Sequence, residues 1–382
     1  MSFKKINAWL HLWLGLISGI IVFIMSITGC ILVFEHEIKP LISPWLHAKA
    51  PAGTPQLPPS VLFQSAQAAL PGLEANSVWY GGEGRTAKVS IENSDSVVYV
   101  NPYTAEVTAI RDHEDFFHVM LDGHVWLWLP QEIGHHVTAW GTFIFFFLLI
   151  SGIILWWPKK WSKANKDKSF KIKWNARFKR LNYDLHNVLG FYSLIVAAII
   201  AFTALLMCFG WLSNGVFWVS SGGESRPPRV RAFSDTTKIN VVAGLDQVDK
   251  AWRKGVTELG SYNKHEIIVA APHDPKDAIY VCVDMINGTW RDIYLDQHTL
   301  EMLPSSGAKI TDLKMADLIS RTNYGLHVGA IGGITTKILY FLASLICASL
   351  PVTGFFVWWG KRNKQPIAAK RKPATRTGAS MA

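Results

Sequence analysis

Cysteine is scarce in this sequence. Only four cysteines occur in 382 residues, and Cys30, Cys208 and Cys347 lie within long apolar segments, which leaves Cys282 alone outside them. The sequence contains no C-x-x-C pair and no C-x-x-C-H motif. A disulfide framework and covalent haem attachment are therefore not expected.

Charge is also scarce, because charged residues make up only 17% of the chain and hydrophobic residues 49%. This composition excludes an ordinary soluble protein. Four segments reach the length of about 20 residues that a helix needs to cross a bilayer: 8–34, 137–157, 185–211 and 334–359. The first has a longer apolar run than a secretory signal, so we expect a retained anchor.

Acidic residues are almost absent from two basic stretches, although the net charge is +10. Residues 158–180 contain ten Lys or Arg and one acid, and the tail after Trp359 has seven basic residues and no acid. Residues 36–135 instead have eleven acids and five bases. Basic loops lie on the cytoplasmic side, so both termini and the central loop are predicted to be cytoplasmic. The basic loops then serve as orientation signals and anionic-lipid contacts, and nucleic-acid binding is not expected.

The sequence repeats itself. An offset of 175 residues relates four pairs in the first and third apolar segments: His11 with His186, Gly15 with Gly190, Thr28 with Thr203, and Phe34 with Phe209. An offset of 195 relates four pairs in the exported regions: Tyr99 with Tyr294, Asn101 with Asp296, Thr104 with Thr299, and Glu106 with Glu301. The chain is thus a duplicated helix–module–helix unit, and its two-fold axis is expected along the membrane normal.

The expected fold is an integral membrane, α-helical protein with four transmembrane helices in two repeated pairs and two exported α+β modules. Each module is predicted to have one helix, at 60–70 or 241–259, followed by short strands. These strands are expected at 78–80, 87–91, 97–100, 266–270 and 279–285. The predicted organisation is transmembrane helix 1 (1–36), module 1 (37–117), a histidine-bearing segment with helix 2 (118–158), a basic loop (159–183), helix 3 (184–212), module 2 (213–310), an amphipathic segment with helix 4 (311–360) and a basic tail (361–382).

His11 and His186 are the first candidate site. Each lies one or two turns inside the cytoplasmic boundary, and an ionisable group there indicates function. Because they are repeat equivalents, a two-fold axis can bring them face to face, which suits two-imidazole ligation of a planar haem. Gly15 and Gly190, one turn further on, would leave space on the same helix face. The competing interpretation is that both are interfacial polar residues.

A second candidate site lies at the exported ends of the helices. His124 and His327 occupy similar places before the two returning helices, so we pair them as repeat equivalents. His136 is the rival partner, and three further histidines are alternates: His36, His118 and His135. A Zn or Cu site is the alternative use of this cluster, although no H-E-x-x-H motif occurs. Taking 11–36 as one helix puts its ends about 37 Å apart, so two stacked cofactors are predicted.

Three motifs carry a family resemblance: the repeated H-x-x-x-G helix, the [ST]-G-x-x-x-W-W returning helix and the Y-[VL]-[ND]-x-x-T-x-E hairpin. Over essentially residues 1–360 the chain resembles the PepSY-associated transmembrane family, and within it the inner-membrane reductases of ferric siderophores such as ferrioxamine. The resemblance implies a multi-pass protein of the bacterial inner membrane with two non-covalent haem b groups. It also implies reduction of Fe(III) bound to a hydroxamate siderophore in the periplasm. The implied haem ligands are His11, His186, His124 and His327.

The remaining predictions concern the residues that dock the substrate, the electron donor and the alternative functions. Four aromatic residues on the exported side are candidates for siderophore docking, with an interfacial aromatic belt as the alternative: Trp126, Trp128, Trp218 and Tyr324. No Gly-rich dinucleotide fingerprint is present, so we expect a quinol or a cytoplasmic redox protein as the donor. A siderophore permease or accessory binding subunit without redox chemistry is the alternative function, and a sensor or inhibitor of extracytoplasmic proteins is a third.

Overall fold

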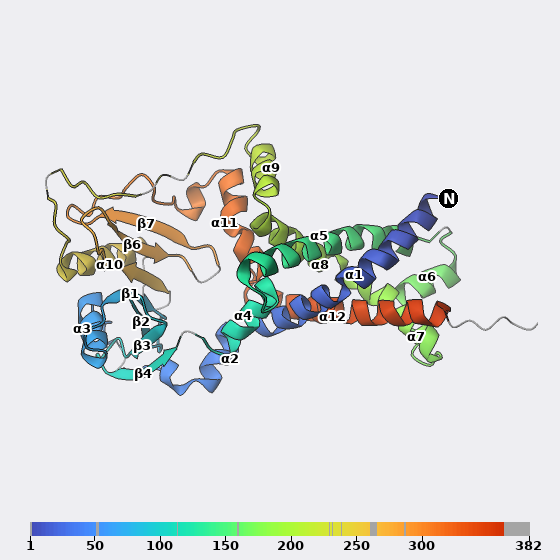
Figure 1. The fold of residues 1–382 in the computed structure, drawn as a ribbon, viewed down its shortest axis with the longest axis horizontal. Helices are drawn as coiled ribbons and strands as arrows, with labels where there is room; N and C mark the ends of the chain where they lie inside the picture. The colour runs from blue at the N-terminus through green and yellow to red at the C-terminus, as the bar shows by residue number, and fades with distance from the viewer. Residues whose placement is uncertain are drawn as a thin grey trace, which may run out of the picture.

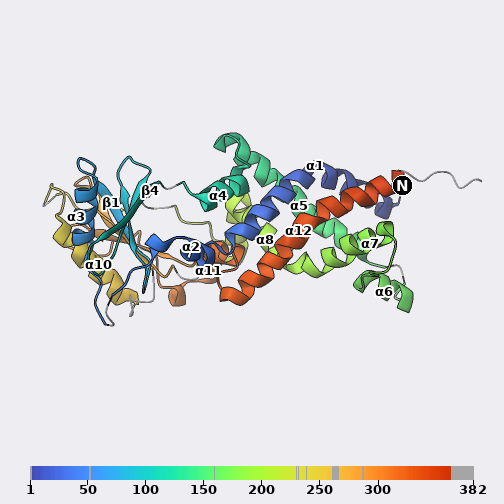
Figure 2. The same cartoon turned by 90° about the horizontal axis from the view of Figure 1, so that it is seen from below.

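The computed structural model describes residues 2–50, 53–112, 114–158, 160–228, 230, 232–237, 239–259, 266–285 and 288–362. Most of the predicted basic tail, 363–382, lies outside these residues. The molecule is elongated, with a helix bundle at one end and a β-sheet at the other (Figures 1 and 2). The N-terminus lies at the bundle end far from the sheet. We call these the N-terminal end and the sheet end of the bundle.

Four helices are long and apolar enough to cross a membrane, in agreement with the predicted fold class. They are α1 (Phe3–Leu32), α5 (Gln131–Trp156), the continuous segment Phe178–Cys208 and α12 (Gly333–Arg362). The third span consists of α7 (Phe178–Asp184), a π-helical turn η2 (Leu185–Leu189) and α8 (Gly190–Cys208). Helices α1 and α8 each pack against both α5 and α12, so the four form a closed ring.

Shorter helices surround the bundle. At the sheet end, α4 (Phe116–Trp126) packs on α1 and α5, whereas α11 (Met315–His327) packs on α8 and α9 (Gly210–Ser220). The short helix α6 (Lys163–Phe170) lies at the N-terminal end (Figure 1). Helix α1 ends at Leu32, and a turn separates it from α2 (Glu35–Ile42) and the 3₁₀ turn η1 (Pro44–Leu46). The expectation that His11 and His36 share one helix is therefore wrong.

Both exported modules contribute to one antiparallel sheet of seven strands, in the order β4-β3-β2-β1-β5-β6-β7. The strands are β1 (Ala75–Tyr80), β2 (Ala87–Ile91), β3 (Ser96–Val100), β4 (Val107–Asp112), β5 (Ile267–Ala270), β6 (Ala278–Val283) and β7 (Arg291–Asp296). The first strand of each module, β1 and β5, pair antiparallel, with Val78 opposite Val269. An antiparallel pairing of two equivalent strands is consistent with a two-fold relation between the modules.

Helices α3 (Pro59–Ala69) and α10 (Leu245–Leu259) pack on the sheet and on each other. The Tyr80 ring stacks on Trp252 with centroids 5.3 Å apart. Asp249 of α10 accepts hydrogen bonds from the backbone N–H and the hydroxyl of Ser60, at 2.9 and 2.6 Å, and so caps α3 of the other module. The two modules therefore share one hydrophobic core and are joined by the hydrogen bonds between Asp249 and Ser60.

The repeated hairpin motif forms the same turn in both modules. Asn101 and Asp296 each accept a backbone N–H two residues on through the side chain, and each backbone N–H bonds the carbonyl five residues on. Ala105 and Leu300 take the same left-handed conformation, with φ of 64° and 57°. The offset of 195 residues thus corresponds to real structural equivalence.

Candidate functional site

His11 of α1 and His186 of the π-helical turn lie opposite each other inside the bundle, near its N-terminal end. Their ring centroids are 6.4 Å apart and the ring planes are perpendicular. His11 Nδ1 lies 2.7 Å from the hydroxyl oxygen of Ser151 on α5. One turn earlier on α1, Asn7 donates from its side-chain amide to the carbonyl of the same residue, Ser151, at 3.0 Å. Two contacts to one residue therefore fix this part of α1 against α5.

The second half of the chain repeats this arrangement. His186 Nδ1 lies 2.9 Å from Thr353 Oγ1 on α12. Asn182, one turn earlier, donates from its amide to the Thr353 carbonyl at 2.9 Å. In each half, therefore, an asparagine and a histidine four residues apart both contact the same serine or threonine.

His124 of α4 and His327 of α11 form an equivalent pair at the sheet end, with ring centroids 6.3 Å apart and planes at 52°. Their Nδ1 atoms each lie 3.1 Å from a threonine hydroxyl, Thr28 on α1 and Thr203 on α8. Each Nδ1 also reaches a backbone carbonyl, of Met25 at 2.9 Å for His124 and of Ile200 at 3.1 Å for His327. Seventeen residues of α1 separate His11 from Thr28, so the two pairs are about 26 Å apart along the helix.

The hydroxyl partners determine which ring nitrogen carries the proton. Each of the four hydroxyls donates its hydrogen to a carbonyl of its own helix: Ser151 to Leu148, Thr353 to Ser349, Thr28 to Ile24 and Thr203 to Ile199. Each oxygen is then left to accept, so we assign Nδ1–H as the donor in all four rings; for His124 and His327 the Met25 and Ile200 carbonyls require the same tautomer. Nε2 consequently keeps its lone pair in all four rings, as a metal ligand requires. The six side-chain hydrogen bonds described above for these four rings all involve Nδ1.

The spacing of each pair fits a metal held between the rings. Two bonds of about 2 Å place the nitrogens about 4 Å apart, and each ring centre lies roughly 1 Å further out. The sum, about 6 Å, agrees with the observed 6.4 and 6.3 Å. Burial lowers the pKa of His124, and burial followed by the charge of His124 lowers the pKa of His327 to about 4. Both rings outside the spans are therefore neutral near pH 7.

Small residues follow the hydroxyls and leave room for the rings. A Cβ on Gly152 would lie 3.5 Å from His11 Cε1, and one on Gly354 would lie 3.3 Å from His186 Cε1. A Cβ on Gly29 would lie 3.2 Å from His124 Cε1. Gly15 and Gly190, the glycines expected to make this space, instead face Leu148 and Leu350 at 3.9 and 3.6 Å.

The asparagine spacing was missed as a signal in the sequence, and the [ST]-G steps were noted only as a motif of the returning helices, not as partners of the histidines. The pattern N-x-x-x-H occurs at His11, His186 and His327, where Asn323 donates to the Thr203 carbonyl at 3.0 Å. The receiving step is [ST]-[GA] four times: Thr28-Gly29, Ser151-Gly152, Thr203-Ala204 and Thr353-Gly354. The repeated sequence therefore contains both the histidines and the residues that hold their rings in place.

The alternate histidines lie elsewhere. His36 is exposed on α2, and His136 is exposed on α5 beside Ile17 and Trp140. His118 lies 3.8 Å from Asp122, and the rings of neighbours His135 and His136 are 6.3 Å apart. In the described residues, no group of three or more His, Cys, Asp or Glu side chains could hold a metal ion.

Of the docking candidates, Trp126 shares α4 with His124 and Tyr324 shares α11 with His327, whereas the other two lie on neither helix. Tyr324 packs against the second module. It is 44% exposed, and its ring lies 5.1 Å from that of Trp290 in the second module. Trp128 covers Gly123 and donates to the Val119 carbonyl at 2.7 Å, whereas Trp218 is exposed on α9. Trp126 packs its backbone and Cβ against Gly134.

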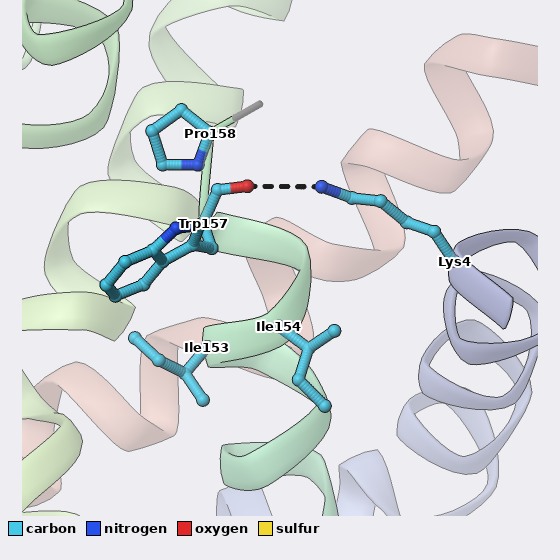
Figure 3. Close-up of a pocket in the computed structure, with 5 residues that line it drawn as sticks. All are labelled: Lys4, Ile153, Ile154, Trp157 and Pro158. Atoms are coloured by element: carbon cyan, nitrogen blue, oxygen red, sulfur yellow. Dashed lines mark hydrogen bonds between the residues drawn. The ribbon is translucent and has the colours of Figure 1, made fainter. Parts of the chain in front are cut away.

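An open groove adjoins the His11 site at the N-terminal end (Figure 3). It is lined by Lys4 of α1 and by Ile153, Ile154, Trp157 and Pro158. Lys4 Nζ donates to the Trp157 carbonyl at 3.1 Å across it, as Figure 3 shows. The groove therefore begins one residue beyond the Ser151-Gly152 step.

A comparison with protein families agrees with this architecture. The family model described as "PepSY-associated TM region" matches residues 8–361, nearly the whole of the described chain. No curated protein matches the chain closely enough to count as a relative. The four spans, the duplicated modules and the family match together show that this is a multi-pass membrane protein of the PepSY-associated transmembrane family.

Proposed function

We propose that the chain is a di-haem reductase of the bacterial inner membrane, which carries electrons across the bilayer to Fe(III) bound by a siderophore in the periplasm. The observation that supports this most is the presence of two facing imidazole pairs at opposite ends of one bundle. In each ring Nδ1 is committed to a hydroxyl, so Nε2 is free to bind iron.

Two haem b groups would be held by His11 with His186 and by His124 with His327. Bound haem supplies a one-electron Fe(III)/Fe(II) couple, and iron with two imidazole ligands suits electron transfer better than oxygen chemistry. The chain itself holds the ring orientation through Ser151, Thr353, Thr28 and Thr203. The apolar contacts of Leu149, Ala197, Ala201 and Cys347 keep water from the middle of the bundle.

The basic N-terminal end of the bundle is assigned to the cytoplasm and the sheet end to the periplasm, by the distribution of Lys and Arg. The family resemblance supports a ferric hydroxamate siderophore as substrate. Fe(II) binds hard oxygen ligands far less tightly than Fe(III), so one electron releases the metal without hydrolysis of the carrier. The packed bundle interior favours electrons, rather than the siderophore, as what crosses the membrane.

Purification of the full chain and its absorption spectrum test the proposal. We expect a Soret band and about two haems per chain, because each imidazole pair supplies both axial ligands. His11→Ala and His186→Ala should each remove about half of the haem. After reduction by dithionite under anaerobic conditions, added ferrioxamine should reoxidise the protein and yield Fe(II).

His47→Ala is the matched control. His47 donates from Nε2–H to the Pro40 carbonyl at 2.9 Å and contacts neither histidine pair, so this variant should keep both haems. A colourless protein would reject the haem proposal, and a haem protein that ferric siderophores leave reduced would reject the substrate.

A further inference from the structure

The short helix α6 lies at the N-terminal end of the bundle (Figure 2). Its lysine side chains form an exposed basic surface. Lys163, Lys166 and Lys168 are exposed on it, and its single acid, Asp167, pairs with Lys171 at 2.9 Å. The helix sequence K-A-N-K-D-K-S-F has no apolar stripe. A helix that lies in the membrane interface needs an apolar stripe to insert into the lipid. Because α6 lacks one, its lysine face is expected to be in contact with water.

An aromatic cluster joins α6 to the bundle. Trp156 of α5 stacks on Phe191 of α8, with ring centroids 3.9 Å apart and planes at 7°. Phe170 at the end of α6 contacts both rings, at 5.1 Å from Trp156 and 5.3 Å from Phe191. Trp156 Nε1 donates to the Ser169 carbonyl at 3.1 Å, which anchors the end of α6. The partly exposed Trp161 extends the cluster to the surface, 6.0 Å from Trp156.

This cluster adjoins the first histidine pair. Trp156 lies one turn beyond Gly152, which faces His11, and Phe191 lies five residues after His186. Contiguous side chains therefore lead from the basic surface of α6 to α5, which carries the Ser151 partner of His11, and to the third span, which carries His186. The basic surface of α6 and the aromatic cluster therefore lie at the same end of the bundle as the His11–His186 pair.

We propose that α6 is the docking surface for a soluble, acidic, one-electron carrier protein, which supplies the electrons for the proposed reductase. This inference rests on the proposed function. Hydroxamate oxygens favour Fe(III) so strongly that a strong reductant is needed, which favours a low-potential carrier over a quinol. One reduced carrier gives up one electron and one siderophore-bound Fe(III) becomes Fe(II), so no proton or further oxidant is needed. Opposite charges steer such a partner to the surface and speed its association.

Binding and electron transfer are measured separately, with a plant-type ferredoxin or a flavodoxin as the acidic probe. The full chain in nanodiscs of zwitterionic lipid is titrated with the oxidised probe, and the Kd is followed as salt rises. The reduced probe is then mixed with the oxidised protein under anaerobic conditions. We expect Lys163→Glu with Lys166→Glu to weaken binding and slow reduction about ten-fold at low salt, with haem content and reduction by dithionite unchanged.

Lys361→Glu with Arg362→Glu is the control, since it makes the same charge change at an exposed end of α12. This control should bind the probe nearly as well as the unchanged chain. Equal weakening in both variants, or binding that ignores salt, would overturn the docking site. Rapid haem reduction by a short-chain quinol, but not by either probe, would overturn the carrier in favour of a lipid-soluble donor. Absence of haem would instead reject the proposed function.

Discussion

At the scale of residues, the four hydroxyls do more than fill space beside the rings. Thr353 donates its own hydrogen at 2.9 Å to the Ser349 carbonyl, and this leaves its oxygen to accept from His186. The sequence shows T-G and S-G steps, but it cannot show that their hydroxyls meet imidazoles from another helix. That meeting depends on how α5 and α12 are placed against α1 and the third span, which is a tertiary property.

Thr353→Val should raise the reduction potential of the haem proposed at the His11–His186 pair. Valine keeps the shape of the side chain but cannot accept a hydrogen bond, so the His186 ring loses electron density and stabilises Fe(III) less. A hydrogen bond of about 1 kcal/mol corresponds to roughly 40 mV for one electron. Potentiometric titration followed by the α-band measures the shift.

Ser349→Ala provides the comparison for this titration. Ser349 lies one turn earlier on α12, and its hydroxyl donates only to the Ile346 carbonyl, at 2.7 Å. Its loss should leave both potentials unchanged. A drop in potential for Thr353→Val, or an equal shift in both variants, would contradict the proposed role of the hydroxyl.

At the scale of elements, the two halves are equivalent in sequence but not in local geometry. His11 lies in regular α-helix, whereas His186 lies in a π-helical turn, a feature frequent at functional sites. Two residues before His186, Asp184 is fully buried, and both of its carboxylate oxygens lie 2.8 Å from Arg180 Nε, whose single N–H they share. The corresponding residue of the first half is Trp9, which is 56% exposed. This ion pair within α7 therefore anchors the second histidine in a way that the first lacks.

Gly29→Leu should remove the haem proposed at the sheet end and keep the other. Even a Cβ here would lie 3.2 Å from His124 Cε1, so a leucine side chain must displace the ring from its hydroxyl. Helix propensity alone would favour the substitution by about 1 kcal/mol, so α1 should remain formed. Haem content per chain, measured after purification, is expected to fall by about half.

The same substitution at Gly215 separates a local clash from a general effect. Gly215 lies in α9, and a Cβ there meets nothing within 4 Å. Gly215→Leu should therefore keep both haems. Full haem content in Gly29→Leu would show that the His124 ring can move aside without loss of ligation.

Elements with strong apolar patterns were predictable, and those shaped by tertiary contacts were not. All four spans were found, because a run of about 20 apolar residues leaves few alternatives. Strands β4 and β7, the two edges of the sheet, were both missed. Most residues of β4 are exposed, so it has no continuous buried face in the sequence to detect. The third span begins at Phe178, seven residues earlier than predicted, because its polar first turns are held by Asn182 and Asp184 rather than by apolar burial.

At the scale of the whole molecule, two-fold symmetry organises both ends. In the sheet it pairs β1 with β5, and in the bundle it brings one histidine from each half to each site. The sequence predicted the two histidine pairs from the repeat, including His124 with His327 across a one-residue gap. It could not predict the single shared sheet, because hydrogen bonds between edge strands of two modules leave no mark in either module alone.

One variant at each end of the bundle tests the order of the two sites in the proposed electron path. His327→Ala should lose the haem near the sheet and keep the other, which an electron donor at the N-terminal end can still reduce. That retained haem should stay reduced when ferrioxamine is added, because about 26 Å separates it from the sheet end. His186→Ala should show the reverse: donor reduction is lost, yet haem reduced by dithionite is still reoxidised by ferrioxamine. Stopped-flow spectra of both variants measure this. Reoxidation of His327→Ala at the rate of the unchanged chain would mean that the siderophore does not receive its electron at the His124–His327 pair.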